Sequence, residues 1–396
     1  MKDNKFTLVL LICNMLLLSS SNTLVMPFLP LYLKTQLQCP AESLYLYTAI
    51  CYSVTFVVSM VISPVWGKFA DIFGKKTMLM RVLVLLAISY LFCAFAKTPL
   101  QLCLARAFQG LASGITPAFL GLVSAYSDKD KTGTNLGFIQ SSNLIGTILG
   151  PIIGGIIAQL FGVRECFLIV LTVVTLLLVV NVIFIHEPKN DNKDNEVKDH
   201  TTIKGLLSDP IIQSLCSCIF VNAMVIMMIV PMLSTYVQNL TDNNESIALS
   251  GIIFSLSGIS GAIAAPLWGR AGTQNGFLRV MHLSVLGAAI FYLIAYAFPD
   301  IYIFALIQFL FGACICACAP CVHSITAKHI QKEHHTKAYA LIYSFQQLGN
   351  LTGPLICSII ICYSSMNRIF LFASASLLLL SIYLLFIQIK RQKKQK

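Results

Sequence analysis

Long apolar stretches with few charges recur along this chain, and they limit what it can fold into more than any other feature. Each is about 20 residues long or longer, which is the length of helix that spans the hydrocarbon core of a bilayer. Because hydrocarbon offers no partner for backbone N–H and C=O groups, we expect every stretch to be an α-helix. The sequence predicts twelve of them, at residues 6–34, 44–66, 76–96, 99–126, 134–161, 165–186, 210–237, 246–268, 280–298, 301–327, 338–362 and 368–389.

The composition agrees with a membrane protein and excludes a soluble one. Hydrophobic residues make up 57% of the chain and charged residues 11%, whereas soluble domains carry about 25% charged residues. So few charges do not cover a water-facing surface. The first stretch is also too long for a signal peptide and has no small-residue cleavage pattern. We therefore expect an all-α membrane protein with twelve transmembrane helices.

The charges are distributed in a way that predicts the topology. Of the 27 lysines and arginines, 22 fall at the termini and in alternate gaps between the stretches, 4 fall in the other gaps, and Arg106 lies inside a stretch. Such an asymmetry is typical of the positive-inside rule. We expect both termini to be cytoplasmic, and we attribute the net charge of +11 to topology and not to nucleic-acid binding.

The 14 cysteines lie mostly inside the apolar stretches, so they do not indicate a disulfide framework. One cluster, Cys314, Cys316, Cys318 and Cys321, leaves two interpretations open. It is either a metal or redox site, or a set of small apolar packing residues on a membrane helix. Packing is the interpretation we favour, and we expect no metal, no cofactor and no catalytic residues.

The two halves of the chain repeat one another. Pro27 and Tyr32 recur as Pro231 and Tyr236, and further pairs follow in order at nearly the same offset. We therefore expect two pseudo-symmetric six-helix halves, residues 1–188 and 209–396, joined by a polar cytoplasmic linker, residues 189–208. The other matching pairs are SPVWGKFADIFG with APLWGRAGTQNG, LARAFQG with LIQFLFG, Pro117 with Pro320, and GTILGP with GNLTGP.

Duplicated halves with proline-interrupted helices favour a transporter that works by alternating access, with the substrate held between the halves. Proline removes a backbone donor and permits bending. A matched pair in the first and seventh stretches, Pro27 and Pro231, is therefore more informative than a single tolerated proline.

Three short motifs refine this interpretation: GKFADIFGKK at 67–76, LARAFQG at 104–110 and GTILGPIIGG at 146–155. They resemble the G-x-L-A-D-x-x-G-R-K loop, the R-x-x-Q-G pattern and the G-x-x-x-G-P-x-x-G-G motif of the major facilitator superfamily. The chain is most similar to its twelve-helix drug:proton antiporters, of the bacterial multidrug-resistance type that confers fosfomycin and deoxycholate resistance. The resemblance covers the whole chain, with Phe69 and Lys75 departing from the loop pattern.

The resemblance implies a role for each motif. The loop residues, Gly67, Asp71, Gly74, Lys75 and Lys76, would form a latch for the outward-open state, and its second-half copy has Thr273 in place of Asp71. Arg106 would take part in proton transfer. The antiporter motif points to export, and its glycines permit close helix packing. Its residues are Gly146, Gly150, Pro151, Gly154 and Gly155.

Arg106 also stands out on physical grounds. It lies about seven residues inside the outer end of its stretch, roughly 10 Å deep, where a charge is costly unless it faces a cavity or a partner. None of the 16 acidic residues lies in the middle of a stretch. This argues against lipophilic cations and favours neutral or anionic solutes. The candidate cavity residues are Asn22, Tyr32, Gln140, Asn143, Asn222, Tyr236, Gln308, Gln346 and Asn350, with Arg106.

The sequence as a whole predicts a monomeric, proton-coupled exporter of small amphipathic compounds in the inner membrane. Its partners would be a small-molecule substrate, protons and the lipid bilayer. The alternative is a dedicated carrier of one metabolite, such as a siderophore, a sugar or an amino-acid derivative. A membrane-embedded enzyme would need clustered nucleophiles, acids or ligands at bilayer depth, and apart from the cysteine cluster the sequence offers none.

Overall fold

The structure is a computed structural model, and it describes residues 2–113, 119, 122, 123, 126, 127, 132–186, 208–241, 246–330 and 335–395. Within these residues all regular elements are helices. They are α1 (Lys2–Leu24), η1 (Met26–Phe28), α2 (Leu29–Thr35), α3 (Ala41–Phe73), α4 (Lys75–Phe95), α5 (Pro99–Gly110), α7 (Thr132–Leu160), α8 (Val163–Phe184), α10 (Pro210–Leu240), α11 (Ser246–Asn275), α12 (Phe277–Ala297), α13 (Ile301–Ile315), α14 (Cys318–His329), α15 (His335–Tyr363) and α16 (Arg368–Gln395).

The all-α membrane architecture is confirmed. Among the described residues, 11 segments are long and apolar enough to cross a membrane. The twelfth predicted span, 99–126, is described only in part: α5 ends at Gly110, and Pro117 lies outside the described residues.

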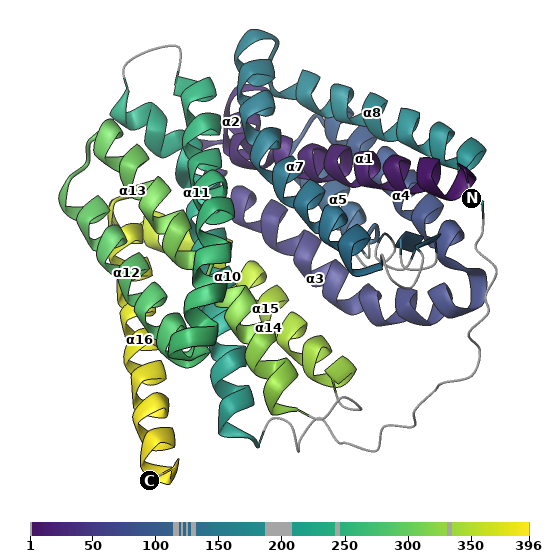
Figure 1. Cartoon of the computed structure of the whole chain (residues 1–396). Coiled ribbons are helices and arrows are strands. Elements are labelled where there is room, and N and C mark those ends of the chain that lie inside the picture. The colour runs from purple at the N-terminus through teal and green to yellow at the C-terminus, as the bar shows by residue number, and fades with distance from the viewer. Residues whose placement is uncertain are drawn as a thin grey trace. The chain divides into compact units, whose positions relative to one another are not determined.

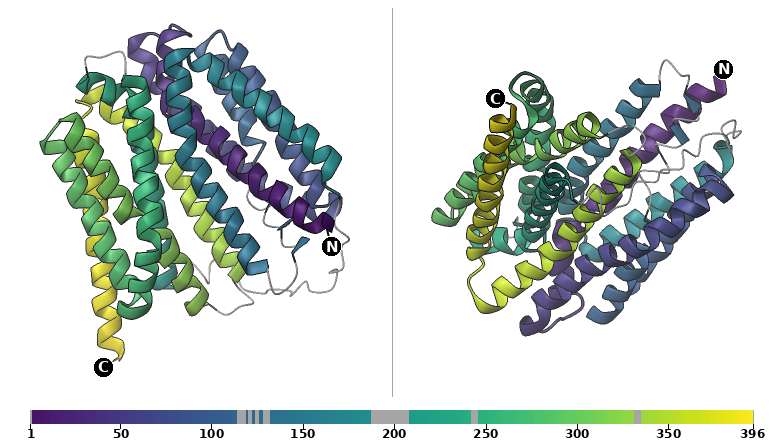
Figure 2. Two further views of the ribbon diagram at one scale, coloured as in Figure 1. Left: turned by 45° about the horizontal axis from the view of Figure 1, so that its top comes forward. Right: turned by 90° about the horizontal axis from the view of Figure 1, so that it is seen from below.

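The helices fall into two compact units. One consists of Met1–Asn192, Leu233–Gln238 and Asp242–Ser255, and the other of Lys193–Met232, Asn239–Thr241 and Leu256–Lys396. In the first unit α1 packs along α7, α4 packs against α8, and α3 packs against α5 (Figure 1). In the second unit α12 packs along α16 and against α13, as the views in Figure 2 also show.

Glycines set the distance between α1 and α7. A Cβ atom on Gly146, Gly150 or Gly154 would lie 2.5, 2.4 or 2.1 Å from a carbonyl oxygen of α1. No side chain fits in that space, so the stripe predicted from the sequence is the contact face of α7. Gly155 faces Ala248 instead, which belongs to the same unit.

The second unit repeats this contact. A Cβ atom on Gly349 would lie 2.3 Å from the carbonyl oxygen of Phe220, and one on Gly353 would lie 2.5 Å from that of Met224. Gly349 and Gly353 belong to the GNLTGP segment that matches GTILGP in the first half. α15 therefore packs against α10 in the way that α7 packs against α1.

Tryptophans cap the carbonyls at two helix ends. The indole Nε1 of Trp66 donates to the carbonyl of Leu111 at 3.0 Å, where α5 ends. The indole Nε1 of Trp268 donates to the carbonyl of Ala313 at 2.6 Å, in the last turn of α13. Carbonyls in the last turn of a helix have no partner within the helix, and hydrocarbon offers none. The two tryptophans supply that partner at matching positions of the two halves.

Prolines break the first helix but not its counterpart. The chain leaves α1 at Leu24, passes through η1 and resumes as α2. Pro30 has no N–H for the carbonyl of Met26, four residues before it, and the hydroxyl of Tyr52 donates to that carbonyl instead. Pro231 lies inside an uninterrupted α10. The difference follows from the sequence, since the first half has two prolines three residues apart where the second half has one.

The packing of α7 gives a matched pair of substitutions. In Gly150→Ala the new methyl group would lie 2.2 Å from the Thr23 hydroxyl oxygen, and such overpacking costs about 1–3 kcal/mol. In Gly137→Ala on the same helix, the methyl group meets no atom within 4 Å. We expect Gly150→Ala to lower the melting temperature of the detergent-purified protein by several degrees and Gly137→Ala to leave it unchanged or raise it. Equal effects of the two substitutions would contradict the close contact with α1.

The indole caps give a second prediction. Trp66→Phe removes the described donor to the half-buried carbonyl of Leu111, and an unpaired carbonyl costs about 1–3 kcal/mol. Trp268→Phe removes one of two described donors to the carbonyl of Ala313. We expect Trp66→Phe to lower the melting temperature more than Trp268→Phe, because the Ala313 carbonyl keeps the Cys316 thiol as a donor at 3.3 Å. A phenylalanine variant that unfolds at the wild-type temperature would show that the indole N–H is not needed at that helix end.

Candidate functional site

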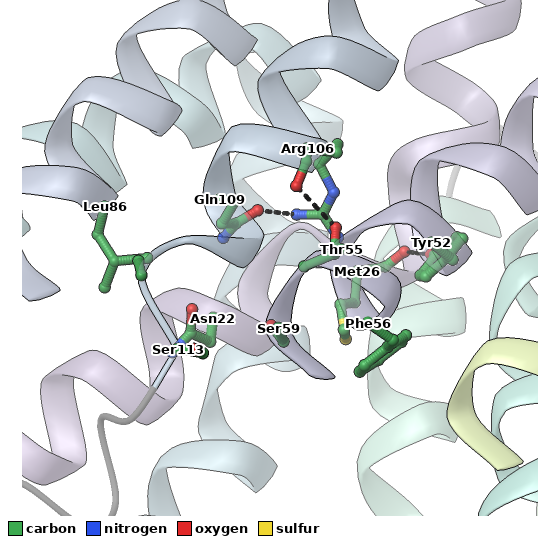
Figure 3. A pocket seen from close by; sticks show the side chains of 11 residues that line it. Asn22, Met26, Tyr52, Thr55, Phe56, Ser59, Leu86, Arg106, Gln109 and Ser113 are labelled. Atoms are coloured by element: carbon green, nitrogen blue, oxygen red, sulfur yellow. Dashed lines mark hydrogen bonds between the residues drawn. The ribbon is translucent and has the colours of Figure 1, made fainter. Parts of the chain in front are cut away.

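A cavity of about 170 Å³ lies inside the first unit. Helices α1, α3, α4 and α5 contribute to its wall, together with η1 and the turn that follows α5 (Figure 3). Its wall is mixed, with aliphatic and aromatic side chains beside several hydroxyl and amide groups. The lining residues are Asn22, Met26, Tyr52, Thr55, Phe56, Ser59, Leu86, Arg106, Gln109, Ala112 and Ser113.

Arg106 is the charged group of this cavity. Its side chain is 5% exposed, and Nη1 donates to Oε1 of Gln109 at 2.5 Å (Figure 3). Its Nε has no hydrogen-bond partner among the described residues. No carboxylate occurs among the described residues that line the cavity. The guanidinium is therefore held by a neutral amide, and its positive charge remains uncompensated by the described wall.

A chain of hydrogen bonds leads from Arg106 across three helices. Nε2 of Gln109 donates to the hydroxyl of Tyr90 at 3.1 Å. That hydroxyl in turn lies 3.1 Å from Oδ1 of Asn22, to which it donates. The chain joins α5 to α4 and α1, so a shift of the guanidinium is coupled to side chains on both of those helices.

Two hydroxyls fix the helix that carries Arg106. Oγ1 of Thr55 donates to the carbonyl of Arg106 at 3.0 Å, and Oγ of Ser59 donates to that of Gly110 at 3.2 Å. A Cβ atom on Gly110 would lie 2.7 Å from the carbonyl oxygen of Thr55, so α3 and α5 touch through their backbones. This contact is what sets the position of Arg106 in the wall.

The other cavity residues predicted in the first half lie elsewhere. Tyr32 is fully buried, donates to the carbonyl of Cys93 at 3.0 Å and packs edge-on against Phe167. Asn143 accepts a hydrogen bond from Ser19 at 2.6 Å and so joins α7 to α1. Gln140 is exposed. Of the predicted set, the structure brings Asn22 and Arg106 together in this cavity.

The candidates in the second half do not gather around a described pocket. Asn222, Tyr236 and Gln308 are buried, whereas Gln346 and Asn350 are half-buried. Asn350 donates to Gln347 at 3.0 Å on the same helix. Gln308 occupies the position that matches Arg106, so the second half has a neutral amide where the first half has a cation.

The loop motif is described only in part. Gly67 and Asp71 belong to α3, but their side chains lie outside the described residues. Gly74 connects α3 to α4 with φ of 87°, a conformation that favours glycine, and Gly276 repeats it in the second half with φ of 90°. Lys75 and Lys76 begin α4, and Nζ of Lys76 donates to the carbonyl of Val182 in the last turn of α8 at 3.3 Å. A cation is favoured at that helix end.

The cysteine cluster lies in α13, in α14 and in the turn between them, within the second unit. Cys318 and Cys321 are buried, and Cys314 and Cys316 are half-buried. Within the part of the chain that the structure describes, no group of three His, Cys, Asp or Glu side chains is arranged to hold a metal ion.

Of the residues that line the cavity, the predicted set contains Asn22 and Arg106. The residues it misses include Tyr52 and Gln109, and it also misses Tyr90, which joins the hydrogen-bond chain. Gln109 was within reach, because it belongs to the R-x-x-Q-G pattern and lies one turn from Arg106. Tyr90 also carries a signal, since Tyr292 repeats it 202 positions later and both are buried. Tyr52 carries none that we recognise, because its role depends on which carbonyl Pro30 leaves unpaired.

Spanning helices in two sets that repeat the same contacts, with a polar cavity in the first set, define a multi-pass membrane transporter. A sequence profile for the Major Facilitator Superfamily matches residues 11–239 and 215–396. The chain therefore belongs to the major facilitator superfamily.

The relatives with similar sequences include proteins named for multidrug resistance. "Multidrug resistance protein MdtG" of Rahnella sp. (strain Y9602) is 31% identical over 340 residues, which cover 84% of this chain and 82% of that protein. The protein of the same name from Proteus mirabilis (strain HI4320) is 31% identical over 91% of this chain and 90% of its own length. The fold matches the crystal structure of a bacterial homologue of the human lysosomal transporter Spinster with a TM-score of 0.81, at 13% identity and 96% coverage of both chains.

The hydrogen-bond chain predicts the effect of removing one hydroxyl. Tyr90→Phe keeps the ring but leaves Gln109 and Asn22 without their shared partner, so we expect a loss of about 1 kcal/mol in stability. Thermal unfolding in detergent measures it. The control is Tyr302→Phe, because Tyr302 is 83% exposed. Identical unfolding of the two variants would show that the chain through Tyr90 contributes nothing.

Proposed function

We propose that this protein exports small amphipathic compounds from the cell in exchange for protons. The observation that carries the proposal is the buried Arg106, held in a cavity by a neutral amide. A buried charge in a membrane span is costly and is retained where it has a role. The names of the relatives support multidrug export as the kind of role, and the antiporter motif, which forms the tight α1–α7 contact, supports exchange over uptake.

The charge of the cavity supports a preference among substrates. With a guanidinium and no carboxylate in the described wall, an amphipathic anion gains a charged partner, whereas a lipophilic cation is repelled. A neutral compound binds through the apolar lining of the cavity and through the amide and hydroxyl groups in its wall. We therefore propose neutral and anionic amphipathic compounds as the substrate class.

Transport would proceed by alternating access of two halves, residues 1–188 and 209–396, joined by the linker 189–208. Arg106 would couple protonation to the conformational change through Gln109 and Tyr90. The loop with Gly67, Asp71, Gly74, Lys75 and Lys76 would latch one state. The protein would act as a monomer in the inner membrane, with both termini in the cytoplasm.

Transport into inverted membrane vesicles tests the proposal. Vesicles with an acidic interior are offered a panel of chemically unrelated anionic, neutral and cationic amphipathic compounds. We expect uptake of several unrelated neutral and anionic compounds, which stops when a protonophore collapses the proton gradient. We expect Arg106→Ala to reduce uptake to background at wild-type expression, because the cavity loses its charge.

The matched control is Arg270→Ala, which removes an exposed arginine from α11 and should leave uptake unchanged. Normal uptake by Arg106→Ala would refute the role given to that residue. Uptake of a single compound from the panel, or uptake that persists without the gradient, would contradict proton-driven multidrug export.

A further inference from the structure

Two cysteines meet in the wall behind the cavity. The sulfurs of Cys51 on α3 and Cys103 on α5 lie 3.1 Å apart, and the two side chains are 0% and 6% exposed. Both are next to the site: Cys51 directly precedes Tyr52, and Cys103 lies one helical turn before Arg106. They are far apart in sequence, so a bond between them would connect two helices.

The surrounding contact holds these helices in place. Thr55, one turn beyond Cys51, donates both to the carbonyl of Cys51 and to that of Arg106, at 3.3 and 3.0 Å. The backbones touch at Gly110, as described above. A disulfide has an S–S length of about 2.05 Å, so the sulfurs need to approach by only about 1 Å. A movement of this size is small compared with the reach of a cysteine side chain that turns about its Cα–Cβ bond.

We propose that Cys51 and Cys103 are a reversible modification site, at which oxidation forms a disulfide that ties α3 to α5 beside Arg106. The oxidant is hydrogen peroxide, which is small and uncharged. One thiolate attacks the peroxide O–O bond and becomes a sulfenic acid, with water as the product. The other thiol then displaces the sulfenic oxygen as a second water and forms the S–S bond. The pair loses two electrons and two protons for each peroxide consumed.

Two further features favour reaction at this pair. Arg106 lies one helical turn beyond Cys103 on α5, so a positive charge is close to the pair, and a nearby cation favours the thiolate that attacks. Cys103 also lies one turn inside the end of α5 that the charge asymmetry assigns to the outer face, where disulfides persist. Cys166 is a useful contrast, because its thiol donates to two carbonyls, those of Gly154 and Gly162, each at 3.6 Å.

Disulfide mapping tests the proposal. The purified full-length protein is treated with hydrogen peroxide, denatured, alkylated with N-ethylmaleimide, digested and analysed by mass spectrometry. We expect a linked peptide that contains Cys51 and Cys103, which dithiothreitol removes, while Cys166 remains alkylated. We also expect the oxidised protein to melt at a higher temperature than the reduced one, because the link restricts the unfolded chain.

Single substitutions test whether the disulfide needs Cys51 and Cys103 or forms through another cysteine. Cys51→Ser and Cys103→Ala, made singly, should each abolish the linked peptide and the rise in melting temperature, and Cys166→Ser should abolish neither. Full alkylation of Cys51 and Cys103 after peroxide, or their linkage to other cysteines, would overturn the proposal. An unchanged melting temperature in the linked protein would overturn the claim that the bond ties α3 to α5. None of these results depends on the transported compound, so they stand apart from the proposed function.

Discussion

Hydrocarbon offers no hydrogen-bond partner, and this constraint explains most of the structure. It forces the apolar stretches into helices, since only a helix satisfies its own backbone groups within one segment. It also explains the helix ends and breaks, where the protein has to supply a side chain for each carbonyl that loses its partner. Trp66, Trp268 and Tyr52 do this at three such positions. The same constraint applies to Arg106, whose donors need acceptors that lipid does not provide.

The cavity around Arg106 shows how this chain provides hydrogen-bond partners for polar groups buried in membrane helices. Buried polar groups in membrane helices are expensive, and here they are organised into a chain from Arg106 to Asn22 and not into isolated pairs. Thr55 and Ser59 anchor the backbone that carries the guanidinium. The second half conserves the structural contacts of the first half, with glycine, tryptophan and buried tyrosine at matching positions. It replaces the cation by Gln308. The matching contacts therefore concern helix packing, whereas at the position of Arg106 the two parts of the chain differ in charge.

The sequence predicted the scaffold better than the site, for a physical reason. Length and hydropathy are properties of a single segment. The position of each transmembrane helix can therefore be predicted without knowing which other helices pack against it. The glycine stripe on α7 was also predictable, because its spacing places all three glycines on one helix face. Which side chains converge depends on the helices that lie next to each other. Tyr32 and Asn143 are polar residues in spans, as predicted, but their partners join helices outside the cavity. Pro231 shows the same limit, because a proline by itself does not decide between a break and a continuous helix.

We propose that Arg106, which has no carboxylate partner among the described residues of the wall, determines what the cavity accepts. Binding of three matched compounds to the purified protein tests it most directly. They share one amphipathic skeleton and carry a carboxylate, a neutral amide or an amine. The account predicts that the carboxylate binds at least as tightly as the amide, that the amine binds most weakly, and that Arg106→Ala removes the advantage of the carboxylate. Tightest binding of the amine, or an order unchanged by Arg106→Ala, would contradict it.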